Sequence, residues 1–300
     1  MGFYCLYRVK FRHKKPVNQA LLSIEQTYRT VRKALRKSGV TENAGREAVW
    51  LMTHVTGLER TEQICCRDQI LSKTHTKDIN FLLERRLSGE PLDNILGHVW
   101  FYGRRFDISK DVLSPRPETE LLVEQAVNIL RKTDKPRVLD LGVGSGAILV
   151  SCLAECDNAI GVGVDLSQAA LNVARQNAAA HQVEAHIELL QSRWFENVTG
   201  QFDLILSNPP YISDAAMYSL PGEVVDYDPD LALRGEADGL GAYRDIISRM
   251  HAYLTPGGKV LFETGYDQGP SVRALLEATG FTDIRIRQDL SGHDRIVYAA

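Results

Sequence analysis

Residues 137–146 read RVLDLGVGSG, in which a short apolar run leads directly into three glycines at alternate positions. Glycine has no Cβ, so a loop of this kind lets the backbone approach a ligand closely. The apolar residues that follow, AILV at 147–150, predict the start of a helix. This order predicts a strand, a ligand-binding loop and a helix, with the loop at the carboxyl edge of a parallel sheet.

Asp165 makes this interpretation more specific. It stands at the end of the next apolar run, AIGVGVDL at 159–166, where a carboxylate can accept hydrogen bonds from both hydroxyls of a ribose. Its alternative role is to cap the helix expected from Ser167. The GxGxG spacing differs from the GxGxxG of dinucleotide folds, and the chain has no Walker lysine for a triphosphate. An adenosine without phosphates, as in S-adenosylmethionine, therefore fits better than NAD or ATP.

Short apolar runs alternate with helix-like segments through the C-terminal two thirds of the chain. The runs are RVLDL at 137–141, AIGVGVDL at 159–166, HIELL at 186–190, FDLILS at 202–207 and KVLFETG at 259–265. This alternation is typical of a parallel sheet with helices on both faces. The last segment, IRIRQDLSGHDRIVYAA at 284–300, predicts two further strands. We therefore expect an α/β fold in this part of the chain.

Residues 24–88 have a different periodicity. Their apolar residues recur at spacings of three and four, which predicts amphipathic helices. Gly39, Gly57 and Gly89 stand where helix C-terminal caps belong. The segment therefore predicts a small helical bundle.

Four parts follow from these patterns. We expect a basic N-terminal extension at 1–23, a helical substrate-recognition domain at 24–92, a linker with a β-hairpin at 93–112 and a catalytic domain at 113–300. Residues 1–16 hold five basic and no acidic side chains, which favours a disordered arm or an over-long gene start over a transit peptide.

The formal net charge of −3 conceals an asymmetry. Residues 1–95 carry 17 Lys or Arg against 10 Asp or Glu, whereas residues 96–300 carry 18 against 28. The basic helical surface is either simply solvated or a docking face for an acidic partner.

Several classes of protein are excluded by composition. The sequence contains neither an apolar stretch long enough to span a bilayer nor the apolar core of a signal peptide, so we expect a cytoplasmic protein without membrane association. The five cysteines and eight histidines lack the spacing of a zinc site. We therefore expect reduced thiols and no metal.

Asn208-Pro-Pro-Tyr211 follows the run FDLILS directly. The end of this strand lies at the same sheet edge as the glycine loop. Two prolines fix the backbone torsions, so the Asn208 side-chain oxygen and a neighbouring main-chain carbonyl can be held as two acceptors for an incoming NH2 group. The alternative is an ordinary proline turn that ends a strand.

Two fixed acceptors suit one particular chemistry. The nitrogen of an amide or aromatic amine is a poor nucleophile because its lone pair is delocalised. Hydrogen bonds from the NH2 group to two acceptors encourage pyramidalisation and direct the lone pair at the methyl group of a sulfonium, while Tyr211 packs on the planar group. Methyl transfer is then a single in-line displacement.

Asn-Pro-Pro-Tyr after a glycine loop resembles the amino-methyltransferases that act on adenine N6, cytosine N4 or glutamine N5. Further motifs are similar to the release-factor glutamine methyltransferases of the HemK/PrmC family, and the resemblance extends from about residue 25 to the C-terminus. These motifs are GEPL at 89–92, ILG at 95–97, LSPRPETE at 113–120, YDP at 227–229, AL at 232–233, DGL at 238–240 and GHDR at 292–295.

The resemblance implies a Rossmann-like S-adenosylmethionine-dependent methyltransferase fold with a seven-stranded, mostly parallel sheet and an N-terminal helical bundle. It implies that S-adenosylmethionine is bound by Gly142, Val143, Gly144, Ser145, Gly146, Asp165, Trp194 and Asn208. It also implies that Asn208, Pro209, Pro210 and Tyr211 hold the substrate, and that Asn208, Pro209 and Tyr211 serve catalysis. The substrate would be the glutamine of the GGQ motif in a peptide-chain release factor.

Two positions depart from the family. Arg193 stands where members often carry Asp, which puts an acidic contact to the adenine amino group in doubt, and Asn94 stands where they often carry an aromatic residue. Arg116 and Glu118 in PRPETE either line the substrate entrance or form structural salt bridges. The competing function is a nucleic-acid amino-methyltransferase, but a pI near 6.3 and an acidic C-terminal part disfavour nucleic acid as substrate.

Overall fold

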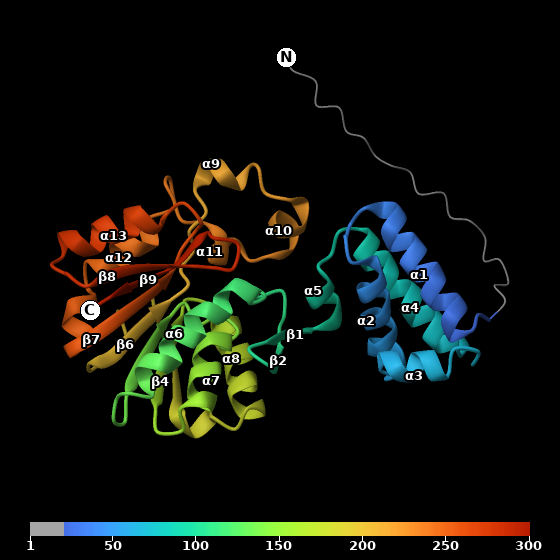
Figure 1. Ribbon diagram of the computed structural model, residues 1–300, viewed down its shortest axis with the longest axis horizontal. Coiled ribbons are helices and arrows are strands. Elements are labelled where there is room, and N and C mark those ends of the chain that lie inside the picture. Colours follow the sequence, from blue (N-terminus) through green and yellow to red (C-terminus); the bar gives the residue numbers. More distant parts are fainter. Residues whose placement is uncertain (1–20) are drawn as a thin grey trace, which may run out of the picture. The chain divides into compact units, whose positions relative to one another are not determined.

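The computed structural model describes residues 21–300, which form two units that divide between Leu87 and Ser88 (Figure 1). Most of the predicted N-terminal extension, residues 1–20, lies outside the described residues. Each unit has a hydrophobic interior of its own. They are therefore described one at a time.

The first unit is helical. Its helices are α1 (Ile24–Ser38), α2 (Ala44–Thr56), α3 (Arg60–Cys65) and α4 (Lys73–Leu87). The apolar positions that predicted these helices face inward, because Leu35, Leu51 and Ile79 are fully buried. Gly39 and Gly57 end α1 and α2 in the left-handed conformation, as predicted, with φ of 73° and 72°. The predicted helical bundle is confirmed.

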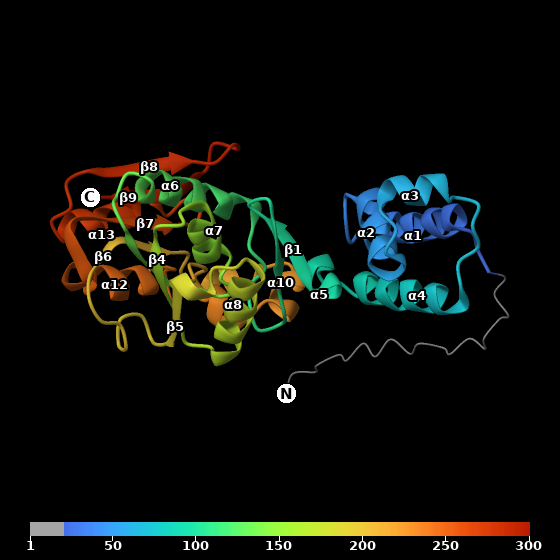
Figure 2. The same ribbon diagram turned by 90° about the horizontal axis from the view of Figure 1, so that it is seen from below.

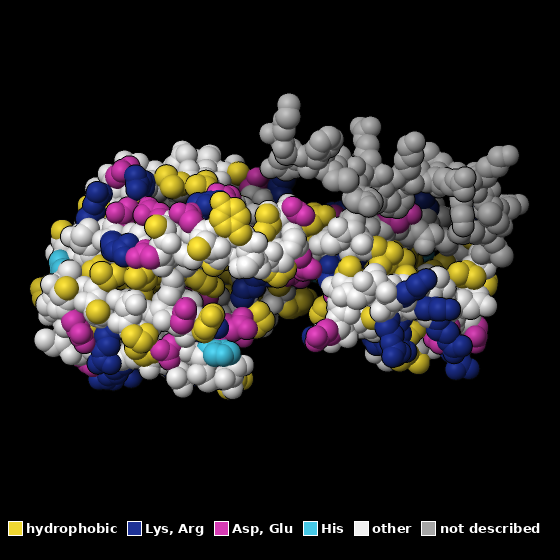
Figure 3. Space-filling view, turned by 90° about the horizontal axis from the view of Figure 1, so that it is seen from above, with side chains coloured by type: hydrophobic (Ala, Val, Ile, Leu, Met, Phe, Trp, Pro, Cys, Tyr) yellow, Lys and Arg dark blue, Asp and Glu magenta, His cyan; other side chains and the backbone are white. Residues whose placement is uncertain are grey.

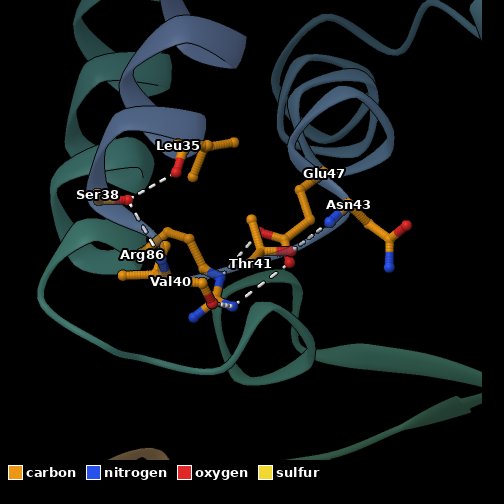
Figure 4. Close-up of polar contacts among 7 residues, drawn as sticks. All are labelled: Leu35, Ser38, Val40, Thr41, Asn43, Glu47 and Arg86. Carbon is orange, nitrogen blue, oxygen red and sulfur yellow. Dashed lines mark hydrogen bonds and ion pairs between the residues drawn. The ribbon is translucent and has the colours of Figure 1, made fainter.

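An ion pair lies inside this helical unit (Figure 4). The Nε of Arg86 on α4 donates to Oε2 of Glu47 on α2 at 2.8 Å, and its Nη2 donates to the carbonyl of Val40 at 2.8 Å. Both side chains are almost fully buried. Removing either charge would leave the other without its partner in a region of low dielectric constant, so the pair fixes α4 against α2.

The second unit begins with α5 (Leu92–Leu96) and the antiparallel hairpin of β1 (His98–Phe101) and β2 (Arg104–Asp107). Oγ of Ser114 donates to Asp93 on α5 at 2.8 Å. Residues 92–96 therefore belong to the second unit, which begins at Ser88, whereas the sequence analysis ended the helical domain at residue 92 and began the linker at residue 93.

A seven-stranded sheet forms the centre of the second unit, in the order β5-β4-β3-β6-β7-β9-β8. All neighbouring strands are parallel except the pairs that involve β9, which is antiparallel to β7 and β8. The strands are β3 (Arg137–Leu141), β4 (Ile160–Asp165), β5 (Ile187–Gln191), β6 (Phe202–Ser207), β7 (Leu254–Glu263), β8 (Ile284–Gln288) and β9 (Asp294–Ala299). Each overlaps a run from which a strand was predicted, although β7 begins at Leu254, five residues before its predicted run. The expected fold class is confirmed.

Helices cover both faces of this sheet (Figure 2). One face packs on α6 (Glu120–Leu130), α7 (Ala147–Glu155) and α8 (Gln168–Ala180), and the other on α12 (Gly241–Ile247) and α13 (Gly269–Ala278). Alternate strand residues serve the two faces: Val138 belongs to the first apolar cluster and Leu139 to the second. Burial on both faces explains why the strands read as continuous apolar runs.

The remaining elements are short. They are the single-turn helices η1 (Pro117–Thr119), η2 (Glu184–His186) and η3 (Met250–Tyr253), and α9 (Asp214–Met217), α10 (Gly222–Tyr227) and α11 (Asp230–Leu233) between β6 and α12. The sequence analysis did not predict α9 to α11, because helices of four to six residues carry no periodicity.

The chain reverses its direction of travel across the sheet at β3. It proceeds from β3 to β4 and β5 on one side and then returns to β6 on the other. In open α/β sheets such a reversal leaves a crevice at the carboxyl ends of the strands. The glycine loop, Asp165 and Asn208 all stand at that edge, after β3, β4 and β6.

Candidate active site

A cavity of about 700 Å³ opens at this edge of the sheet. Its volume lies within the range of small-molecule sites. The predicted site residues among its lining are Gly142, Val143, Gly144, Ser145, Asp165, Trp194, Asn208 and Pro210. Gly146, Pro209 and Tyr211 are not part of the lining. The structure thus brings together residues from the carboxyl ends of four strands, β3, β4, β5 and β6.

The glycine loop has the left-handed backbone that favours glycine. The φ angles of Gly142, Gly144 and Gly146 are 82°, 54° and 81°. A Cβ at Gly146 would lie 3.2 Å from the backbone of Ala174 on α8, whereas a Cβ at Gly144 would meet open space. Gly146 therefore serves the packing of α7 on α8, and the first two glycines leave room beside the cavity.

The Asp165 carboxylate is held by backbone groups on both oxygens. Gly144 N donates to Oδ2 at 2.9 Å and Ser167 N donates to Oδ1 at 2.8 Å. Burial raises its pKa, and these backbone bonds lower it. The cap of α8 is Ser167, whose Oγ accepts from Ala170 N. The carboxylate is thus fixed at the cavity wall, and the capping role predicted as its alternative belongs to its neighbour.

A second buried carboxyl, Asp140, lies below the loop and was not predicted as a site residue. It is fully buried, and neither oxygen has a partner within ordinary hydrogen-bond geometry. Burial, followed by the nearby charge of Asp165, raises its pKa to about 7. The available signal was an acidic residue within an apolar strand.

Trp194 forms another wall of the cavity. The edge of its ring lies 4.0 Å from the position of a Cβ on Gly142, and its φ of 50° is rare for a side chain of this size. Ser192 supports this turn, because its Oγ donates to the Trp194 carbonyl at 3.1 Å and accepts from Asn197 N at 3.0 Å. Arg193 points to Asp245, with 3.1 Å between Nη2 and Oδ2.

The turn after β6 is tied to β3. Oγ of Ser207 donates to the carbonyl of Leu141 at 2.6 Å, so the strand ends that carry Asn208 and the glycine loop have a fixed separation. The carbonyl of Tyr211 accepts from Nε2 of Gln268 at 2.9 Å. Burial raises the pKa of Tyr211, which stays neutral near pH 7.

Arg116 combines the two roles predicted for it as alternatives. It lines the cavity, and its Nη2 also donates to Oδ2 of Asp228 at 2.8 Å. The Asp228 side chain is 5% exposed, and burial raises its pKa against the lowering effect of Arg116. This bond links the segment before α6 to the residues between α10 and α11. Glu118 is exposed and lies outside the lining.

Two further features concern the described residues only. No group of three or more potential metal ligands occurs within residues 21–300. No helix in that range is long and apolar enough to cross a membrane.

Comparison with known proteins gives matches along both units. Residues 26–97 match the PrmC N-terminal domain family, and residues 117–225 match the methyltransferase small domain family. The catalytic domain of hMettl16 in complex with a MAT2A 3′UTR hairpin has a TM-score of 0.52 and 13% identity, and covers 65% of this chain and 74% of that one. That similarity concerns the fold alone.

The sequence relatives are more similar. A release factor glutamine methyltransferase of Agrobacterium fabrum is 38% identical over 89% of this chain and 93% of its own length. One of Cereibacter sphaeroides is 42% identical over 88% of this chain and 94% of its own length. With this identity over nearly the whole length of both proteins, the chain belongs to the family of release factor glutamine methyltransferases.

Proposed function

We propose that this enzyme transfers the methyl group of S-adenosylmethionine to the side-chain nitrogen N5 of the glutamine in the GGQ motif of a peptide-chain release factor. One observation carries the proposal. The glycine loop with Asp165 and the turn at Asn208 line the same cavity, which supports a nucleoside site beside the expected acceptor at Asn208. Such a substrate belongs to translation, which agrees with an enzyme of the cytoplasm.

The cavity fits an adenosine that lacks phosphates. Asp165 presents a carboxylate to the ribose hydroxyls, and the Trp194 ring provides an apolar wall for the base. Gly142, Val143, Gly144 and Ser145 bring backbone close to the ligand, while Gly146 acts through helix packing. When bound, S-adenosylmethionine supplies an electrophilic methyl group on a sulfonium.

The substrate amide would be held by the Asn208 turn. Oδ1 of Asn208 and a main-chain carbonyl of the turn accept the two N–H bonds of the glutamine, which directs its nitrogen lone pair at the methyl group. Pro209 and Pro210 keep the acceptors at a set separation, and Tyr211 supports the planar group. Transfer breaks the bond between sulfur and the methyl group and forms the bond between nitrogen and the methyl group. The positive charge passes from sulfur to the amide nitrogen, which becomes neutral by releasing one of its protons to water.

The helical unit is proposed to bind another part of the release factor. Its described residues 21–87 carry 12 Lys or Arg against 8 Asp or Glu, and Figure 3 shows Lys and Arg side chains gathered on part of its surface. Lys33 and Lys37 are exposed on α1. Changing both to Glu should raise the KM for an intact release factor by roughly tenfold at low salt and leave methylation of a short GGQ peptide unchanged.

The direct test of the function is mass spectrometry after incubation with isotopically labelled S-adenosylmethionine. A release factor, bulk DNA and rRNA are offered separately. Label on the GGQ glutamine alone supports the proposal. Label on adenine or cytosine without label on the release factor would reject it in favour of a nucleic-acid amino-methyltransferase.

A further inference from the structure

Glu263 lies beside Asn208 at the carboxyl edge of the sheet. Ser207 at the end of β6 pairs with Phe262 on the parallel strand β7, so Asn208 and Glu263 follow on adjacent strands. Glu263 is 2% exposed and does not line the cavity. It therefore stands behind Asn208, where it cannot touch the substrate.

Few hydrogen bonds or charges offset the free-energy cost of removing the Glu263 carboxyl from water. Thr119 and Asn208 lie close to this carboxyl, and both favour its ionised form. Its Oε2 has no partner within ordinary hydrogen-bond geometry. The nearby Arg295 is already engaged, with Nη2 3.0 Å from Oδ2 of Asp289. An incompletely paired buried carboxyl destabilises a fold, so stability does not explain its presence.

The chemistry of an asparagine side chain supplies an explanation. Its amide has an acceptor end and a donor end of nearly the same shape, and only its hydrogen bonds determine which end faces the cavity. An ionised carboxylate can only accept. A carboxylate behind Asn208 therefore binds the NH2 end and turns Oδ1 toward the cavity.

We infer that Glu263 is a positioning residue for methyl transfer: it holds the Asn208 amide in the one orientation that offers Oδ1 to the NH2 group of the substrate. The inference rests on the proposed function, because it assigns a direction to the acceptor at the substrate site. One N–H of Asn208 goes to Glu263, and the other stays available on the cavity side.

The orientation depends on the ionisation of Glu263. Burial raises its pKa to about 7, against the lowering effect of Thr119, Arg295 and Asn208. A protonated carboxyl can donate to Oδ1 and thereby occupy the acceptor that the substrate needs. The other titratable groups whose charges affect it or respond to it are Glu118, Tyr211 and Tyr243. Turnover should therefore decline as the pH falls through about 7, with Glu263 as the group responsible.

The test compares the wild type with Glu263→Gln in single-turnover methylation of a release factor at saturating cofactor, from acidic to alkaline pH. Glutamine keeps the shape but offers either end to Asn208, so the rate should fall roughly 10- to 100-fold above pH 7, and the acid decline should disappear. Affinity for S-adenosylhomocysteine should change by less than about twofold, because Asp165 and the glycine loop are untouched. Glu277→Gln, on the exposed face of α13, is the matched control and should behave as wild type.

A double-mutant cycle separates positioning from a general structural role. If Glu263 acts through Asn208, Glu263→Gln should have little further effect in an Asn208→Ala background. Glu263→Asp keeps the ionisable group on a shorter side chain, so its turnover should be slower but should still decline at acid pH. This variant provides the test if Glu263→Gln does not fold. Wild-type turnover or an unchanged acid decline in Glu263→Gln would overturn the inference. A wild type that leaves glutamine unmethylated would instead overturn the proposed function.

Discussion

The two halves of the cavity are built in different ways. The half proposed to hold the cofactor is made mainly of backbone: Gly142 and Gly144 have positive φ, and the Asp165 carboxylate is fixed by the N–H groups of Gly144 and Ser167. The acceptor half depends on side chains from distant parts of the sequence, since Thr119 and Asn208 both lie close to the Glu263 carboxyl. The first half follows from a local motif, and the second requires the assembled sheet.

The largest effect is expected in the acceptor half. Asn208→Ala removes one of two acceptors that orient the nucleophile, so turnover should fall roughly 100-fold, or about 3 kcal/mol in activation free energy. Asn208→Asp keeps an acceptor but adds charge beside Glu263, so it should be intermediate. Single-turnover rates at saturating cofactor and substrate measure this. Near-normal turnover in the alanine variant would leave the proline turn with only an architectural role.

Substitutions in the cofactor half should change cofactor affinity more than the rate of methyl transfer. Asp165→Ala removes a charged acceptor that is used in the ground state and the transition state alike, so cofactor affinity should weaken by about 1.5 to 3 kcal/mol. Calorimetric titration with S-adenosylhomocysteine measures the change. Ser167→Ala is the matched control, because it removes the cap of α8 and should lower stability without lowering affinity. Equal losses of affinity in both variants would assign Asp165 a structural role only.

Glycines within the same loop should differ from one another. Alanine at Gly144 meets only the cost of a positive φ, about 1 kcal/mol of unfolding free energy. Alanine at Gly146 adds a close contact with Ala174, so it should lower the unfolding free energy by about 2 kcal/mol or more. Chemical denaturation of both variants tests this. Equal losses would mean that α8 moves easily and that Gly146 is no packing residue.

The same contrast explains how far the sequence could be interpreted. Strands, the glycine loop and the Asn208 turn follow from local patterns, and the structure brings them to one edge as expected. Glu263 was interpreted only as part of the strand run KVLFETG, because its partnership with Asn208 depends on the register between β6 and β7. Asp140 was missed for a similar reason. In each case a carboxyl in an apolar run was the available signal.

The smallest effect is expected at Arg193, the position at which a departure from the family was predicted. Its side chain is 57% exposed, and its partner Asp245 is 42% exposed, so the pair contributes about 0 to 1 kcal/mol. If backbone groups recognise the adenine, the Arg193 side chain is not needed to bind it. Arg193→Ala should then change affinity for S-adenosylhomocysteine by less than about twofold, and Asp245→Ala should match it. A tenfold loss of this affinity in Arg193→Ala alone would mean that the Arg193 side chain binds the base. The two halves of the cavity would then both depend on side chains.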